Sequence, residues 1–161
     1  MILGGVTIPY EKGLDGHSDA DAVLHAICDA MLGALALGDI GSHFPDTDPR
    51  YRGISSLDLL RAVASLLRSR GFQVDSLDAN IIAEAPKLSP YIERMRANIA
   101  GTLELDPGAV SIKAKTHEKL GPIGNGEAIA AQAICLVSPI PSEVTREGSK
   151  RGAGETENGE R

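Results

Sequence analysis

Apolar residues recur every three or four positions in three long stretches of the chain, and this period predicts helices. Each stretch opens on a residue that can cap a helix and closes at a glycine or a turn. These helices are expected over residues 19–37, 55–71 and 89–105, with Asp19, Ser55 and Ser89 as their caps.

Short apolar runs between these stretches predict strands. The first covers Ile2–Ile8, is interrupted by Gly4-Gly5 and stops at Pro9. The others are expected over residues 74–84, 109–116 and 127–138. The last run is apolar enough for a strand buried on both faces. Helices and strands therefore alternate, which predicts an α/β fold.

The alternation ends near residue 138, so residues 1–138 are expected to form one domain. Residues 139–161 carry many charges, glycines and serines and almost no large apolar side chains, which predicts a disordered tail. Hydrophobic residues make up 42% of the 161 residues and aromatic ones only 3%, so the core must be aliphatic.

Charge and hydropathy narrow the function. The net charge is −6 and no basic cluster stands out, so we expect no nucleic-acid partner. No apolar run reaches the roughly 18 residues of a membrane span. Cys28 and Cys135 lie in apolar patterns and are expected to be buried free thiols of a reducing compartment. We also expect no signal peptide, and so a cytosolic protein or a mature organellar form.

A polar stripe runs along the otherwise apolar first helix. Asp21, His25 and Asp29 are four residues apart and so share one face, and His17 lies just before them. Imidazole is a common metal ligand, and a carboxylate one turn away can hold its other ring nitrogen. The alternative is that Asp21 and Asp29 only cap the helix and solvate His25 on an exposed face.

Two further polar segments fall at the ends of predicted strands, where functional loops are common. Residues 83–90 read "AEAPKLSP" and present Lys87. Residues 113–127 read "KAKTHEKLGPIGNGE" and combine a hydroxyl, a carboxylate and lysines. Such groups suit a phosphate held partly through a divalent ion. Ordinary charged turns are the alternative.

Three long strings carry a family resemblance. They are residues 2–49, which contain "HSDADAVLHAICDAMLGALALGDIGSHFPDTDP", "IIAEAPKLSPYIERMRANIA" and "KAKTHEKLGPIGNGEAIAA". The chain resembles the 2-C-methyl-D-erythritol 2,4-cyclodiphosphate synthase family of the non-mevalonate isoprenoid pathway. The resemblance implies an α/β (α+β) sandwich of a mixed sheet and helices, assembled as a homotrimer with active sites between subunits. It also implies cyclisation of 4-diphosphocytidyl-2-C-methyl-D-erythritol 2-phosphate, with release of CMP.

The resemblance assigns roles by position. His25 is the implied zinc ligand (zinc or another divalent transition metal), with Asp21 and Asp29 near it or the sugar, and Glu118 binds magnesium or manganese. His17 and Thr116 are the implied catalytic residues. The implied substrate-binding residues are His17, Ser18, Asp39, Ile40, Gly41, a mobile loop of Phe44, Pro45, Asp46, Thr47 and Asp48, a cytosine pocket of Ala83, Glu84, Ala85, Pro86, Lys87, Leu88 and Ser89, a diphosphate segment of Lys115, Thr116, His117 and Glu118, and Pro122 and Asn125.

The chain departs from the family pattern in three places. Members open with a strand that bears an Asp-x-His pair, the other two zinc ligands, before the segment that here follows Met1. Asn125 stands where many members have an Arg that can hold an anion near the trimer axis, and Pro122 replaces a residue that is often aromatic.

The resemblance therefore implies one of two proteins. One is an active synthase, bacterial or from a plastid stroma, whose sequence starts upstream of Met1. The other is a trimeric CMP- or CDP-binding protein with impaired catalysis. A generic metal hydrolase is disfavoured because the chain has no three-ligand motif.

Overall fold

The computed structural model describes residues 1–14 and 16–141, so most of the predicted tail lies outside the described residues. Strands and helices alternate as expected. In chain order they are β1 (Ile2–Leu3), β2 (Val6–Thr7), α1 (Ala22–Ala34), α2 (Ile40–His43), α3 (Ser56–Ser69), β3 (Phe72–Ile82), α4 (Ile92–Leu103), β4 (Val110–Lys115), α5 (Gly121–Gly124) and β5 (Ala130–Pro139). Short 3₁₀ helices cover Pro49–Tyr51, Ser89–Tyr91 and Pro107–Ala109.

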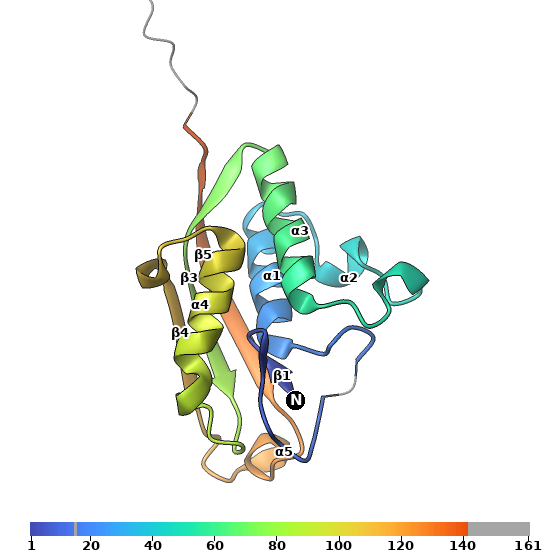
Figure 1. Cartoon of the computed structure of the whole chain (residues 1–161), viewed down its shortest axis with the longest axis vertical. Coiled ribbons are helices and arrows are strands. Elements are labelled where there is room, and N and C mark those ends of the chain that lie inside the picture. Colours follow the sequence, from blue (N-terminus) through green and yellow to red (C-terminus); the bar gives the residue numbers. More distant parts are fainter. Residues whose placement is uncertain (15, 142–161) are drawn as a thin grey trace, which may run out of the picture.

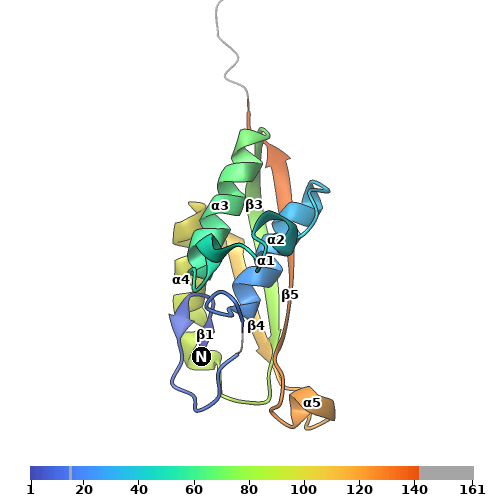
Figure 2. The same ribbon diagram turned by 90° about the vertical axis from the view of Figure 1, so that its right-hand side faces the viewer.

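The main sheet has β3 at its centre, parallel to β4 and antiparallel to β5. The expected mixed sheet is therefore confirmed. Helices α1, α3 and α4 pack together against one face of this sheet (Figures 1 and 2). Alternate residues of β3, namely Leu77, Ala79 and Ile81, are buried on that face. They join the apolar sides of the three helices in one aliphatic core.

No helix of this chain covers the other face of the sheet, as far as the described residues go. Ser76 and Asp78 of β3 lie on this side, opposite Leu136 and Ile134 of β5. Ile134 and Leu136 remain 66% and 64% exposed. The prediction that the last strand is buried on both faces is therefore wrong for a single chain.

The N-terminal segment is a tight hairpin, whereas the sequence predicted one interrupted strand. β1 and β2 pair antiparallel around Gly4 and Gly5, whose φ angles are +57° and +69°. Two successive positive φ angles define the two-residue turn that matches the twist of a hairpin, and glycine adopts them without strain. The glycines therefore reverse the chain here.

The helix boundaries confirm one predicted cap and correct two. Ser55 caps α3 through the amide of Leu57. Helix α1 begins after Asp21, two residues later than Asp19, and it ends at Ala34. Ser89 lies in the 3₁₀ turn before α4 and makes no side-chain cap bond.

The structure bears on two further expectations, and the expected burial is confirmed for Cys28 but only in part for Cys135. No helix among residues 1–14 and 16–141 is long and apolar enough to cross a membrane. Both cysteines are free thiols, Cys28 fully buried and Cys135 half-buried. Burial raises the pKa of Cys28 to about 12, so this thiol stays protonated and unreactive at neutral pH.

Candidate functional site

A cavity of about 330 Å³ lies where the N-terminal end of α1 meets α2 and the loop that follows it. His17, Ser18 and His25 line it. The other lining residues are Ile40, Gly41, Phe44, Pro45, Asp46, Tyr51, Ile54 and Leu59. The structure thus brings together residues from three segments that the sequence predicted for one site, namely residues 17–25, 39–41 and 44–48. The predicted residues Asp39, Thr47 and Asp48 do not line this cavity.

The ring of His25 contacts hydroxyls, and the described structure gives it no carboxylate partner. Its Nε2 lies 3.1 Å from the Oγ of Ser18 and 3.1 Å from the Oγ of Ser56. Ser56 is fully buried and donates through its Oγ to Asp19 at 2.5 Å. The sequence analysis did not single out Ser56. The available signal was its position directly after the predicted helix cap Ser55.

The hypothesis that a carboxylate of the polar stripe holds the other ring nitrogen of His25 is wrong for Asp21. Its fully buried carboxylate accepts four backbone N–H groups: those of Gly4 and Gly5 at 2.9 and 2.7 Å, and those of Val23 and Leu24 at 3.1 Å. Burial is the largest influence on its pKa and raises it above the ordinary value. Asp21 therefore joins the hairpin to the start of α1.

Asp29 and Asp39 hold α2 in place beside the cavity. The Oδ1 of Asp29 accepts from the amide of Ile40 at 2.8 Å. Asp39 caps α2 and accepts from the amide and the hydroxyl of Ser42, which lowers the pKa of Asp39. The exposed Asp29 is thus one turn from His25 but serves a different element.

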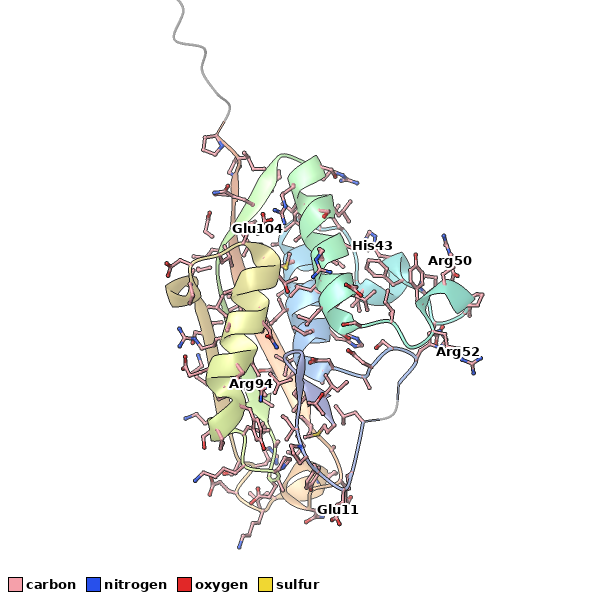
Figure 3. All side chains as sticks on the ribbon, in the orientation of Figure 1. Glu11, His43, Arg50, Arg52, Arg94 and Glu104 are labelled. Carbon is pink, nitrogen blue, oxygen red and sulfur yellow. The ribbon has the colours of Figure 1, made fainter. Side chains whose placement is uncertain are left out.

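The predicted substrate loop, Phe44–Asp48, has an ordered outer turn. Asp48 caps the 3₁₀ helix that follows and forms an ion pair with Arg50, and the hydrogen bonds from Arg50 lower the pKa of Asp48. The rings of Phe44 and Tyr51 meet edge to face, 5.4 Å between centroids. Figure 3 shows Arg50 and Arg52 pointing outward from this turn. The predicted mobility of the loop stays a prediction.

A second group of predicted residues lies where β3 and β4 end; because the family resemblance assigns these residues to the nucleotide, we call the group the nucleotide edge. It comprises Ala83–Ser89, which follows β3, and Lys115–Glu118, which ends β4. Glu84 joins the two segments, since its Oε2 accepts from the amides of His117 and Lys119 at 3.3 Å. Lys87 is exposed beside them.

Within the nucleotide edge, Thr116 and Glu118 act as a pair. The Oγ1 of Thr116 donates to the Oε1 of Glu118 at 2.7 Å. Glu118 and Lys119 have φ angles of +51° and +59°, a conformation that costs free energy in non-glycine residues and is found at functional sites. Pro122 lies in the exposed α5, and Asn125 ends it.

The cavity and the nucleotide edge lie in different parts of one chain. None of residues 83–89 or 115–118 lines the cavity. Both views place α2, beside the cavity, well apart from α5, which follows the nucleotide edge (Figures 1 and 2).

The donor atoms on the described residues differ in what they could hold. No group of three His, Cys, Asp or Glu side chains that could hold a metal occurs among residues 1–14 and 16–141. His25 alone therefore does not fit a zinc ion, which takes about three protein ligands. Glu118 and Thr116 present hard oxygen atoms, which fit magnesium or manganese because these ions need few protein ligands when phosphates supply the rest.

Comparison with known proteins identifies the family. The model of the YgbB family matches residues 1–138, so the chain belongs to this family. The curated 2-C-methyl-D-erythritol 2,4-cyclodiphosphate synthase of Nitrosospira multiformis is 62% identical over 138 residues, which are 86% of this chain and 78% of the relative. The synthase of Chloroherpeton thalassium is 56% identical over 87% of this chain and 89% of the relative.

A solved structure agrees in fold. The 2C-methyl-D-erythritol-2,4-cyclodiphosphate synthase in its CDP-bound form superposes with a TM-score of 0.79 at 36% sequence identity. The match covers 86% of this chain and 89% of that one. The family resemblance drawn from the sequence is confirmed.

Proposed function

We propose that this protein is a lyase that cyclises 4-diphosphocytidyl-2-C-methyl-D-erythritol 2-phosphate to 2-C-methyl-D-erythritol 2,4-cyclodiphosphate and releases CMP, in isoprenoid precursor synthesis. The observation that carries the proposal is the 62% identity to a curated synthase, together with a family match that contains every predicted site segment. This identity favours the enzyme over a CMP- or CDP-binding protein without activity. The bacterial sources of the relatives favour a bacterial cytoplasm over a plastid.

The reaction is intramolecular. An oxygen of the 2-phosphate attacks the β-phosphorus, a new P–O bond closes the ring, and the bond from the β-phosphorus to the bridging oxygen breaks. CMP leaves with that oxygen and its electron pair. Because the substrate carries its own nucleophile, the protein must fold it into line and stabilise crowded negative charge. No covalent enzyme intermediate is required.

The nucleotide edge is assigned to the cytidine and the diphosphate. The backbone and exposed side chain of residues 83–89 would bind the cytidine, with Lys87 as the charged donor. The hydroxyl of Thr116 would donate to the β-phosphate in place of its bond to Glu118. A magnesium or manganese ion held by Glu118 and the phosphates would neutralise the diphosphate. The CDP-bound form of a structural neighbour supports a cytidine nucleotide as the ligand.

The cavity is assigned to the methylerythritol phosphate. His17 and Ser18 would donate to the phosphate, and His17 would stabilise the charge that develops on it. Asp39–Gly41 and Phe44–Asp48 would contact the organic part of the substrate and exclude water. The described residues offer His25 no group of further ligands with which to hold a zinc ion. No step proposed here therefore depends on zinc.

The active form is proposed to be a homotrimer with shared active sites. Two observations support this arrangement. The cavity and the nucleotide edge are separated within one chain, and the uncovered face of the sheet exposes Ile134 and Leu136. A second chain that packs on this face would bury apolar surface that water otherwise contacts.

Product analysis tests the proposed function. The natural gene product is incubated with the substrate and magnesium, and ³¹P NMR follows the phosphorus resonances. Equal amounts of CMP and cyclic diphosphate are expected. CMP that appears together with a linear phosphorylated product would identify a hydrolase and contradict the proposal, as would the absence of turnover.

A further inference from the structure

The turn that carries Glu118 is built from residues that rarely form such a turn. The amide of Leu120 closes it with a hydrogen bond to the carbonyl of His117 at 2.9 Å. The two residues between them, Glu118 and Lys119, have φ angles of +51° and +59°. Glycine, asparagine and aspartate dominate turns with positive φ at both central positions, because other side chains are strained there. Glutamate and lysine keep this conformation only where the surrounding structure holds it.

Glu84 holds the turn from the side of β3. Its Oε2 accepts from the amides of His117 and Lys119, both at 3.3 Å. These distances exceed the usual range of about 2.7–3.2 Å for such a bond. Two long hydrogen bonds at the surface offset only part of the strain of two left-handed residues.

A second restraint comes from the backbone of α5, which packs directly on Lys119. Gly124 is buried, and its amide donates to the carbonyl of Leu120 at 3.1 Å. A Cβ added at Gly124 would lie 2.7 Å from the Cα of Lys119 and closer still to its carbonyl carbon. Carbon atoms normally approach to about 3.5–4.0 Å, and backbone atoms cannot rotate aside as a flexible side chain can. The φ angle of Gly124 is not left-handed, so glycine is required here for space and not for conformation.

We propose that Gly124 is a positioning residue: its bare backbone, packed on Lys119, holds the strained turn and so fixes the carboxylate of Glu118 beside the hydroxyl of Thr116. The 2.7 Å bond from Thr116 to Glu118 is the arrangement that this turn presents. A side chain at position 124 would force the backbone of Lys119 to move. Relaxation of the turn to negative φ angles would then carry the side chain of Glu118 away from Thr116. Gly124 thus acts through Glu118 and without touching the substrate.

The consequence for catalysis rests on the proposed function, whereas the restraint on the turn does not. Gly124→Ala should lower kcat by about 100-fold, the effect of misplacing a reacting group by about 1 Å. The affinity for CMP, measured by calorimetry, should barely change, because the cytidine is assigned to residues 83–89. Equal losses of CMP affinity and of kcat would indicate general damage to the nucleotide edge and refute the specific role of Gly124.

NMR of the turn measures the restraint itself. In the wild-type protein, Glu118 and Lys119 should each give a strong nuclear Overhauser effect (NOE) between their own amide and Hα protons, which lie closest together at positive φ. The Hα protons of Gly124 should also give NOEs to the backbone of Lys119. The absence of either set of NOEs would overturn the proposal, whether or not any variant folds. In Gly124→Ala the intraresidue NOEs should weaken, and a turn that keeps them unchanged would overturn the proposal as well.

The strain in the turn has its own test. Lys119→Gly should raise the melting temperature measured by circular dichroism, because glycine adopts positive φ without a steric penalty. A lower melting temperature would mean that the turn is not strained and needs no restraint from Gly124.

Gly101→Ala is the matched control. It adds the same methyl group to a helix, α4, at a position where nothing lies within 4 Å of the added carbon. The turn NOEs, the CMP affinity and kcat should all stay as in the wild type, and changes as large as those in Gly124→Ala would refute the proposal. If Gly124→Ala loses the turn NOEs but keeps kcat, the turn does not position Glu118 and the proposal fails. A wild-type protein without turnover would instead refute the proposed function, and the NOEs would still decide whether Gly124 holds the turn.

Discussion

Asp21 shows how one buried side chain can connect two elements. Its carboxylate accepts four backbone N–H groups, two from the hairpin turn and two from the first turn of α1. Removal of a buried acceptor leaves its donors without partners, and each costs about 1–3 kcal/mol. Asp21, which the sequence placed in a polar stripe beside a candidate metal ligand, is therefore a helix cap and a structural centre of the N-terminal region.

Asp21→Ala is expected to lower the free energy of unfolding by more than about 2 kcal/mol, the upper range for loss of a helix cap alone. Urea denaturation measures it. Asp39→Ala is the matched control, since Asp39 caps the short exposed helix α2. A loss no greater than in this control would mean that the buried carboxylate does not hold the hairpin.

The raised pKa of Asp21 also sets the sign of a pH dependence. The folded protein binds the proton of this group more tightly than the unfolded chain does. Its contribution to stability is then present below the ordinary value of 3.8 and is lost as the pH rises through the raised pKa. The stability of the wild type relative to Asp21→Asn should fall across that window, and a difference that rises there would contradict the shift.

Lys87 is an exposed cation of the nucleotide edge, and its contribution can be isolated. Lys87→Ala should weaken CMP binding by about 1–3 kcal/mol, because a hydrogen bond from a charged donor is lost. Isothermal calorimetry measures the change. Arg94→Ala removes an exposed cation from α4, as Figure 3 shows, and should leave the affinity unchanged. Equal affinities for the wild type and Lys87→Ala would remove Lys87 from the site.

Glu118 is expected to matter for turnover and not for nucleotide binding. Glu118→Gln keeps the size of the side chain but removes the negative charge that a hard cation prefers. Turnover should fall sharply while CMP affinity barely changes. The exposed Glu11→Gln, which removes an equal charge elsewhere, should keep normal turnover. An active Glu118→Gln enzyme with ordinary magnesium dependence would exclude the proposed role.

At the scale of elements, the apolar period located the three long helices and the central strand, because each buries one face in the same core. The sequence could not distinguish a strand from a hairpin over residues 2–8, since that depends on the φ angles of Gly4 and Gly5. It also misjudged β5. An apolar run indicates burial but not whether the same chain or a neighbour supplies the cover.

The outer face of β5 therefore carries a prediction. Ile134→Asp places a charge on the uncovered face of the sheet, where the proposed trimer would bury it. Light scattering should show smaller species than the wild type, because burial of an unpaired charge is unfavourable. Ala97→Asp places the same charge on the exposed side of α4 and should leave the mass unchanged. A trimer that persists in Ile134→Asp would exclude this face as the interface.

At the scale of the whole molecule, sequence reasoning identified the segments of the site but not their arrangement. The polar segments that follow β3 and β4 have strong local signals in the sequence and were predicted as binding segments. In the structure they lie together at the nucleotide edge. The Ser56–Asp19 pair was missed because its members are 37 residues apart and meet only through packing of α3 beside α1. The separation of the cavity from the nucleotide edge likewise depends on the tertiary fold.

That separation underlies the proposal that one chain supplies the cavity and another the nucleotide edge of each active site. Complementation tests it most directly. His17→Ala damages the cavity and Glu118→Gln the nucleotide edge, and each variant alone should be nearly inactive. Co-expressed in equal amounts, they should form mixed trimers in which about a quarter of the sites combine two intact halves.

CMP release by the purified mixture, compared with the wild type at equal protein concentration, is the measurement. About a quarter of the wild-type rate is expected, since random assembly pairs an intact half with an intact half at that frequency. Glu118→Gln co-expressed with a double variant that carries both changes serves as the control and should stay inactive. A mixture of the two single variants that forms trimers yet remains as inactive as this control would show that each site belongs to one chain, and would contradict the account.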